Sequence, residues 1–272
     1  MRVTLALVED TFREAFARWI FWGLFGLSTL MILFFLFLLK IDVVEGAVAT
    51  LTLFGRTRER DVNLMIRGFY GGIATFIYSW GMALAVFASA GLIPRVLEPG
   101  RIELILSKPV SRLHILLGRF LGNTLVVASN IVYLVAGVWL ILGAKTGIWG
   151  PRFLITIATS IFTFIVLLTV VVLLGVLVES TALATMVTVG LMILSAVLAQ
   201  TSLAVRLLSS EAYRQTWRAL YYALPKVYDM GTMTLDLVRG NAFGGWMPIW
   251  SSALFGLVML GAALTIFEKR DF

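Results

Sequence analysis

FLITIATSIFTFIVLLTVVVLLGVLV, residues 153–178, contains no charged residue and decides the fold class. As an α-helix it exceeds the roughly 20 residues that are needed to cross a 30 Å hydrocarbon core. A strand of a membrane β-barrel would instead show about 10 residues of alternating polarity. The stretch is therefore predicted to be a transmembrane helix.

Five other stretches also lack Asp, Glu, Lys and Arg over a membrane-spanning length. The six predicted spans cover about residues 19–39, 68–94, 116–144, 153–178, 180–205 and 240–267, the third being free of charge from residue 120 onward. No remaining segment is large enough to form a soluble domain. The predicted fold class is an all-α integral membrane protein, with one transmembrane domain over residues 1–272.

Composition agrees with a protein that lies in a bilayer. The chain is 60% hydrophobic and 14% charged, with a net charge of +7 and a mean hydropathy of +0.97. Soluble domains are roughly 45–50% apolar and about 25% charged, so this class is excluded, as is a disordered chain. The absence of cysteine excludes disulfides and thiolate sites. With so apolar a chain, the basic charge favours anionic lipid headgroups over nucleic acid as a partner.

The residues before the first span carry an apolar stripe at helical spacing. Its members are Leu5, Val8, Phe12, Phe16 and Trp19. Two pairs, Glu9–Arg13 and Glu14–Arg18, have the i,i+4 order that stabilises a helix. The pattern predicts an N-terminal amphipathic helix in the headgroup plane, with a solvated helix leading into the membrane as the alternative.

Three connections carry further information. Residues 43–54 are apolar and β-branched enough for a short hairpin, and a charge-dense segment follows at 56–61. Glu179 alone separates the fourth and fifth spans, which predicts a tight helical hairpin. In the connection 206–239, an aromatic stripe that Pro225 ends predicts an interfacial helix, with gating or partner docking as the alternative. That stripe consists of Tyr213, Trp217, Leu220, Tyr221 and Leu224.

The spans lack the groups that several kinds of membrane chemistry require. No ionisable side chain lies inside them, which disfavours a proton- or ion-coupled carrier. His114, the single histidine, has no carboxylate at a suggestive spacing, and no Gly-Lys dipeptide can supply a phosphate loop. No catalytic, cofactor-binding or metal-ligating residue is therefore predicted. Polar groups that line a path or form helix–helix hydrogen bonds are Thr124, Ser129, Asn130, Ser195 and Gln200.

The connection between the second and third spans reads PRVLEPGRIELILSKPVSR, residues 94–112. Pro99 can begin a short helix with Ile102 and Leu106 on its apolar face. Pro109 ends that helix, and Ser111 is placed to cap the next one. The residues alone predict a short amphipathic helix between two spans, and a plain interfacial connector is the alternative.

This string resembles the coupling-helix region of ABC-transporter permeases of the type-2 (type V exporter) class. The family pattern is Glu, Gly-Thr, Leu-Glu, a leucine run, Ser-x-Pro-Val-Ser-Arg and then Leu-Gly-Lys-Phe-Leu-Gly. Arg101 stands where the family has Thr, and Arg119 stands where it has Lys. The layout of the whole chain is similar too, and the subgroup of the nitrous-oxide-reductase maturation permease is the most similar. Matching positions are Glu98, Gly100, Glu103, Leu104, Ile105, Leu106, Ser107, Pro109, Val110, Ser111, Arg112, Gly118, Phe120 and Gly122.

The resemblance implies a permease subunit of the cell (inner or plasma) membrane, with both termini in the cytoplasm. Two permeases, identical or related, would pair with two separate ATP-binding subunits that hold ATP and Mg, so this chain would bind no cofactor and catalyse no reaction. The second and fifth spans would line the path, and the connection 206–239 would be external. The ATPase-docking coupling helix would use Glu98, Gly100, Arg101, Ile102, Glu103, Leu106, Ser107, Pro109 and Arg112.

The charge distribution leaves the orientation open, because with both termini inside, ten of the 22 basic residues would be cytoplasmic. The uncharged spans favour a lipid-like or amphipathic cargo, or mechanical work on a partner outside the cytoplasm. Two other classes stay open. One is an ATP-independent channel or carrier, and the other is a membrane scaffold for an extracytoplasmic complex.

Overall fold

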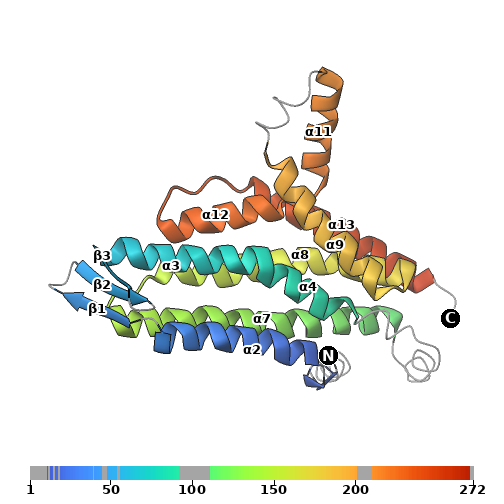
Figure 1. Ribbon diagram of the computed structural model, residues 1–272. Helices are drawn as coiled ribbons and strands as arrows, with labels where there is room; N and C mark the ends of the chain where they lie inside the picture. The colour runs from blue at the N-terminus through green and yellow to red at the C-terminus, as the bar shows by residue number, and fades with distance from the viewer. Residues whose placement is uncertain are drawn as a thin grey trace.

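The computed structural model describes residues 11, 13–14, 16–17, 19–38, 40–44, 48–53, 56–91, 111–200 and 210–269. Most helices lie alongside one another in an elongated bundle, and a small sheet sits at one end (Figure 1). We call this end the sheet end. The opposite end, where α7 begins and α13 ends, is called the junction end.

The helical elements follow the predicted spans in chain order. The membrane part consists of α2 (Trp19–Leu33) with the π-helix η1 (Phe34–Leu38), α3 (Val62–Phe76) with the π-helix η2 (Ile77–Gly81) and α4 (Met82–Ala90), α7 (Arg112–Thr146), the 3₁₀-helix η3 (Pro151–Leu154) with α8 (Ile155–Val178), α9 (Thr181–Leu198), and α13 (Met247–Lys269). Between α9 and α13 lie α11 (Glu211–Ala223) and α12 (Val227–Arg239).

Five of these helices are long and apolar enough to cross a membrane. They cover residues 63–90, 112–146, 151–178, 181–198 and 247–269. The first predicted span is also helical, and its apolar part, Phe21–Phe37, is shorter than the other five. The helical membrane part is thus confirmed for five spans, and the sixth stays a prediction.

The helix ends have local causes. Ser111 caps α7 by accepting a hydrogen bond from the backbone N–H of His114, as predicted. Glu179 adopts a left-handed conformation (φ 55°) between α8 and α9, which produces the predicted tight hairpin. Leu224 is extended (ψ 156°) because the proline that follows disfavours a helical conformation, so α11 ends at Ala223.

The connection after α2 folds into a three-stranded antiparallel sheet. Its strands are β1 (Lys40–Val44), β2 (Val48–Leu53) and β3 (Arg56–Asp61), in the order β1-β2-β3. A hairpin was predicted here from the β-branched residues, and the charge-dense segment adds the third strand. The all-α description therefore holds for the membrane part and omits this sheet.

Helix α8 is the centre of the bundle, packed against α4, α7, α9, α12 and α13. Its side chains Phe164, Leu167 and Leu168 are buried almost completely. A helix that is apolar all round is expected at such a central position, because it has no face that must reach water. The stretch that decides the fold class is thus also the one around which the other helices assemble.

Candidate functional site

Most of the predicted coupling helix lies outside the described residues. This applies to Glu98, Gly100, Arg101, Ile102, Glu103, Leu106, Ser107 and Pro109, whose docking role stays a prediction. Arg112 is described and is the first residue of α7. Its Nη1 donates a hydrogen bond of 3.2 Å to the backbone carbonyl of Glu268 near the end of α13. The start of the third span is therefore tied to the end of the last one.

Two turns further along α7, Arg119 forms an ion pair with Glu14 of the N-terminal segment. The Arg119 side chain is only 2% exposed and that of Glu14 is 15% exposed. The sequence predicted that Glu14 would pair with Arg18, which is not among the described residues. A buried ion pair across 105 positions of sequence fixes the two segments together, because removing either partner strands a buried charge.

Gly122 provides a second contact between the same two segments. A methyl group built on Gly122 would lie 2.6 Å from Cβ of Thr11, so only glycine allows this close approach. The missing side chain at Gly122 thus lets the N-terminal segment approach α7 closely, as small residues do between membrane helices. Methyl groups built on Gly68 and Gly72 of α3 would have no neighbouring atom within 4 Å.

These contacts define what we call the junction: Thr11, Glu14, Arg112, Arg119, Gly122 and Glu268. It joins the N-terminal segment and the end of α13 to the first turns of α7 at the junction end (Figure 1). Because helices and their packed cores move as rigid units, a force on the residue that begins α7 reaches three parts of the bundle. The junction thus connects the first turns of α7 both to the N-terminal segment and to the end of α13.

Most polar groups that the sequence singled out satisfy helix hydrogen bonds. Thr124 and Ser129 donate to carbonyls of their own helix. Asn130 accepts a hydrogen bond of 3.1 Å from Ser28 of α2, and Ser195 accepts one of 3.2 Å from the backbone of Tyr228. Gln200 lies just after α9, and its backbone N–H donates to the carbonyl of Val197 over 3.2 Å. Asn130 and Ser195 thus join neighbouring helices, and Thr124 and Ser129 bond within α7.

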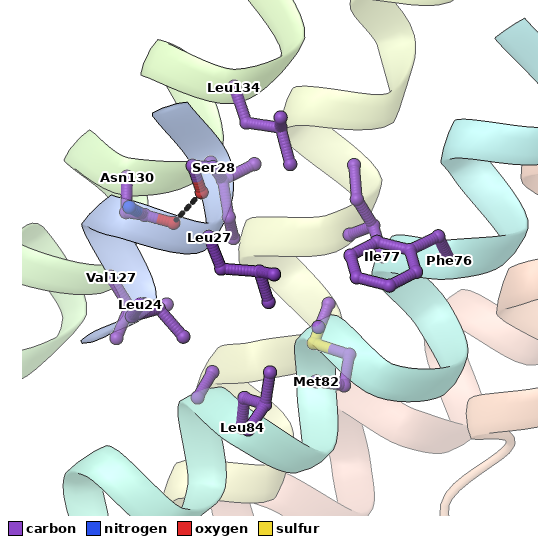
Figure 2. Close-up of a pocket in the computed structure, with 13 residues that line it drawn as sticks. Leu24, Leu27, Ser28, Phe76, Ile77, Met82, Leu84, Val127, Asn130 and Leu134 are labelled. Carbon is purple, nitrogen blue, oxygen red and sulfur yellow. Dashed lines mark hydrogen bonds between the residues drawn. The ribbon is translucent and has the colours of Figure 1, made fainter. Parts of the chain in front are cut away.

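A small cavity lies between α2, α4 and α7, lined largely by apolar side chains (Figure 2). Leu27, Met82 and Leu134 are among its walls, and the Ser28–Asn130 hydrogen bond closes one side. Its volume of about 30 Å³ has room for a water molecule or two. This cavity is too small to be a cargo site.

Helix α12 was missed by the sequence analysis, which described residues 206–239 as an external connection. It packs against α3, α8 and α9. The buried residues of α12 recur at helical spacing in the sequence, and this spacing could have predicted a packed helix. They include Val227, Met230, Thr234 and Val238. Thr234 donates a hydrogen bond of 3.1 Å to the hydroxyl of Tyr78 in η2. The connection thus contributes to the interior of the bundle.

Helix α11 behaves differently and stands away from the other helices (Figure 1). None of its residues is buried, and Tyr213 and Leu220 of the predicted stripe are exposed. Trp217 donates from its indole nitrogen to the carbonyl of Leu198, over 3.1 Å. An exposed amphipathic helix with aromatic rings suits a membrane interface, and that role stays a prediction.

Lys226, at the corner between α11 and α12, is 1% exposed. Its ammonium group donates to the carbonyl of Tyr221 and lies 3.4 Å from the centre of the Tyr221 ring. The Tyr221 hydroxyl donates to Asp229 over 2.8 Å. Burial lowers the pKa of Lys226, and Asp229 opposes that shift. Burial also raises the pKa of Tyr221, with its bond to Asp229 as a second cause. The cluster fixes the corner geometry.

Within the part of the chain that the structure describes, no group of three His, Asp or Glu side chains could hold a metal ion. His114 shares a hydrogen bond with Ser111 at the start of α7, which accounts for its position. The described residues as a whole form a bundle of apolar helices whose third span is bonded to the N-terminal segment and to the end of α13.

Comparison with known families supports this description. The sequence model of a family described as "ABC-2 family transporter protein" matches residues 5–272. No curated protein matches the chain.

Proposed function

The chain belongs to the ABC-2 transporter family and is a multi-pass membrane permease subunit; we propose that closure of separate ATPase subunits, driven by ATP, moves its helices through the junction. The catalytic work, with ATP and Mg, then belongs to the partner. The subgroup of the nitrous-oxide-reductase maturation permease stays a prediction and assigns no substrate.

The junction is the observation that carries this proposal. The segment 95–111 ends where α7 begins, at Arg112, which is bonded to Glu268. Arg119 and Glu14 connect the same part of α7 to the N-terminal segment. A displacement of the preceding loop therefore acts on α7 and α13 together, and on the segment that precedes α2. A plain connector would not need a buried charge pair at its exit.

The proposed docking surface is the short helix before Pro109. Glu98 and Glu103 would pair with basic residues of the ATPase, and Ile102 and Leu106 would fill an apolar groove on it. Gly100, Arg101, Ser107, Pro109 and Arg112 complete the motif on which the docking prediction rests. This arrangement requires the junction end, with both chain termini, to face the cytoplasm.

A second permease copy is part of the proposal. The exposed sides of α9 and α13 are strongly apolar, with Met186 and Ile193 on the first and Trp250 and Leu257 on the second. Such surfaces require lipid or another protein. We expect a homodimer or a heterodimer with a related permease, and two ATP-binding subunits below it.

The cargo class follows from the interior. Two of the polar groups described above, Asn130 and Ser195, are bonded between helices. No charged residue lies within the five described spans between their first and last turns, apart from Arg67 and Arg119 near the ends. An amphipathic or lipid-like cargo suits such an interior better than a hydrophilic ion does. Mechanical output to an extracytoplasmic partner is the second candidate, favoured by the exposed α11.

The first experiment is purification of the tagged chain from its native membrane in mild detergent, with mass spectrometry of the proteins that accompany it. We expect a stoichiometric ATP-binding subunit. A stable oligomer of this chain alone would contradict the proposal and favour an ATP-independent channel or a scaffold.

The docking surface is tested with a charge reversal. Glu98→Lys combined with Glu103→Lys should abolish recovery of the ATPase subunit, while Glu211→Lys on α11 should leave it unchanged. The control changes an exposed carboxylate by the same charge at a position far from the junction in the fold. Retained assembly and normal ATP turnover in the double variant would refute the docking assignment.

A further inference from the structure

A hollow of about 300 Å³ opens at the sheet end of the bundle, where α3 and α8 begin and α12 ends. Three separate elements form its wall. Arg67 and Tyr70 come from α3, Arg152 and Phe153 from η3, and Val238 from α12. None of the residues that line this hollow is acidic. The mechanism described above makes no use of it.

A third arginine lies beside α3 at the end of α12, close to the hollow in the fold. The Nε atom of Arg239 lies 3.5 Å from the position that a methyl group would take on Gly71, one turn after Arg67. Arg152 in turn points at Gly240, where a methyl group would overlap its Nη1 atom. Gly240 also has a positive φ of 86°, which favours glycine there. Two guanidinium groups, those of Arg67 and Arg152, thus line the hollow, and that of Arg239 lies beside α3 one turn further along.

These arginines have no carboxylate partner among the described residues. The described ion pairs involve Arg119 and Arg214, at other positions. Asp236 lies one turn before Arg239, and its carboxylate accepts a hydrogen bond of 2.9 Å from Asn241. Arginines that are gathered without a counter-charge repel one another, and an anion would relieve that repulsion.

The floor of the hollow is rigid and aromatic. Tyr70 is 3% exposed and stacks on Phe153 with ring centroids 4.3 Å apart. Its hydroxyl forms no hydrogen bond of ordinary geometry among the described residues, although the backbone of Gly150 lies near it. The hollow thus offers a neutral donor at its base and guanidinium groups at its rim.

The position in the membrane specifies the ligand further. The hollow lies where the spans begin, and the neighbouring Trp149 is half exposed, as tryptophans are at the level of lipid headgroups. At that depth the abundant anion is phosphate, whose oxygens match the planar fork of arginine. We propose that Arg67, Arg152 and Arg239 bind the phosphate group of an amphiphile, with the Tyr70 hydroxyl below it.

Two sources can supply that phosphate: the headgroup of a bilayer lipid, or a soluble phosphorylated molecule. The site itself does not depend on an ATPase partner, so it is tested without one. The full chain, purified in dodecyl maltoside, is titrated by calorimetry with dihexanoyl phosphatidic acid, with dihexanoyl glycerol and with inorganic phosphate. We expect the phosphatidic acid to bind and the glycerol lipid, which has the same chains and no phosphate, not to bind.

Each of Arg67→Gln, Arg152→Gln and Arg239→Gln should weaken binding about tenfold or more, the loss expected for one charge-assisted hydrogen bond. Arg218→Gln, which removes the same charge from exposed α11, should leave it within about twofold. Competition by inorganic phosphate assigns the soluble source, and its failure assigns the lipid. Equal binding of the two dihexanoyl lipids, or an equal loss in Arg218→Gln, would overturn the site. The comparison of lipids on the unaltered chain decides the question even if a variant does not fold.

Discussion

Breaking the Arg119–Glu14 pair tests directly whether the junction holds the N-terminal segment against α7. In Glu14→Gln the guanidinium group of Arg119, 2% exposed, loses its charged partner inside the protein. Removal of one partner from a buried pair costs about 3 kcal/mol or more. In Arg119→Met the cost should be smaller, because the carboxylate of Glu14 is 15% exposed and reaches water.

The double variant separates the pair from its parts. Glu14→Gln with Arg119→Met removes both charges of this pair, and packing of the methionine offsets part of the lost contact. We expect the two changes together to cost less than their sum, with a coupling energy of about 2 kcal/mol or more. The matched control is the exposed pair Arg214–Glu211, whose nitrogen and oxygen are 3.9 Å apart. Its cycle of Glu211→Gln and Arg214→Met should give about 0.5 kcal/mol or less.

Two measurements are needed, because the loss is expected to be local. Thermal unfolding in detergent gives the free energies of the cycle. Hydrogen exchange shows where protection is lost, and we expect the loss at residues 11–17 and in the first turns of α7. A coupling energy no larger than that of the control pair would refute the assignment. So would a loss of protection spread evenly over all helices.

Three further predictions concern particular backbone and burial features. Gly122→Ala should destabilise the protein by about 1–3 kcal/mol in thermal unfolding, because its methyl group would overlap Thr11, whereas Gly72→Ala, which faces open space, should cost nothing. Gly147→Ala should lower the free energy of unfolding by about 1 kcal/mol, because Gly147 has a positive φ of 71°. Gly190→Ala, in the interior of α9, should leave the stability unchanged or increase it. A loss of stability in both variants would contradict this explanation. Burial lowers the pKa of Lys226 below its ordinary 10.5, so the unfolded chain binds this proton more readily than the folded chain does. The free energy of unfolding should therefore increase as the pH rises toward 10.5. In Lys226→Met this free energy should increase less over the same pH series.

The elements that the sequence predicted well are those that depend on neighbours along the chain. Uncharged runs predicted the spans, Ser111 predicted the cap of α7, and Pro225 predicted the end of α11. A cap or a proline changes the conformation or hydrogen bonding of backbone groups within one turn of it. An apolar run predicts a span because it is long enough to cross the membrane. The small sheet was half predicted, since its first two strands are β-branched and its third is charged.

What the sequence did not reveal depends on partners far along the chain. Glu14 has Arg18 at the favourable i,i+4 spacing, so the pattern favoured a local pair, and the fold instead places Arg119 beside it. Arg67, Arg152 and Arg239 lie in three different connections of the sequence. Each of them alone has the pattern of an ordinary basic residue at the end of a span, so the sequence does not show that they lie near one another. Helix α12 is the exception, because the spacing of its apolar residues was present in the sequence.

The two ends of the bundle use charge in opposite ways. At the junction end, the buried guanidinium group of Arg119 is neutralised within the chain, which gives a fixed geometry. At the sheet end, Arg67 and Arg152 line the hollow and Arg239 lies beside α3, and none of the three has a carboxylate partner among the described residues. Helix α12 connects the two features, because it ends at the hollow and packs on α8, the helix that also contacts α7 and α13. In the proposed mechanism, a movement that begins at Arg112 would reach Arg67, Arg152 and Arg239 through these packed helices. If phosphate binds at the hollow, the position of α12 would depend both on that ligand at the sheet end and on movement of α7 at the junction end.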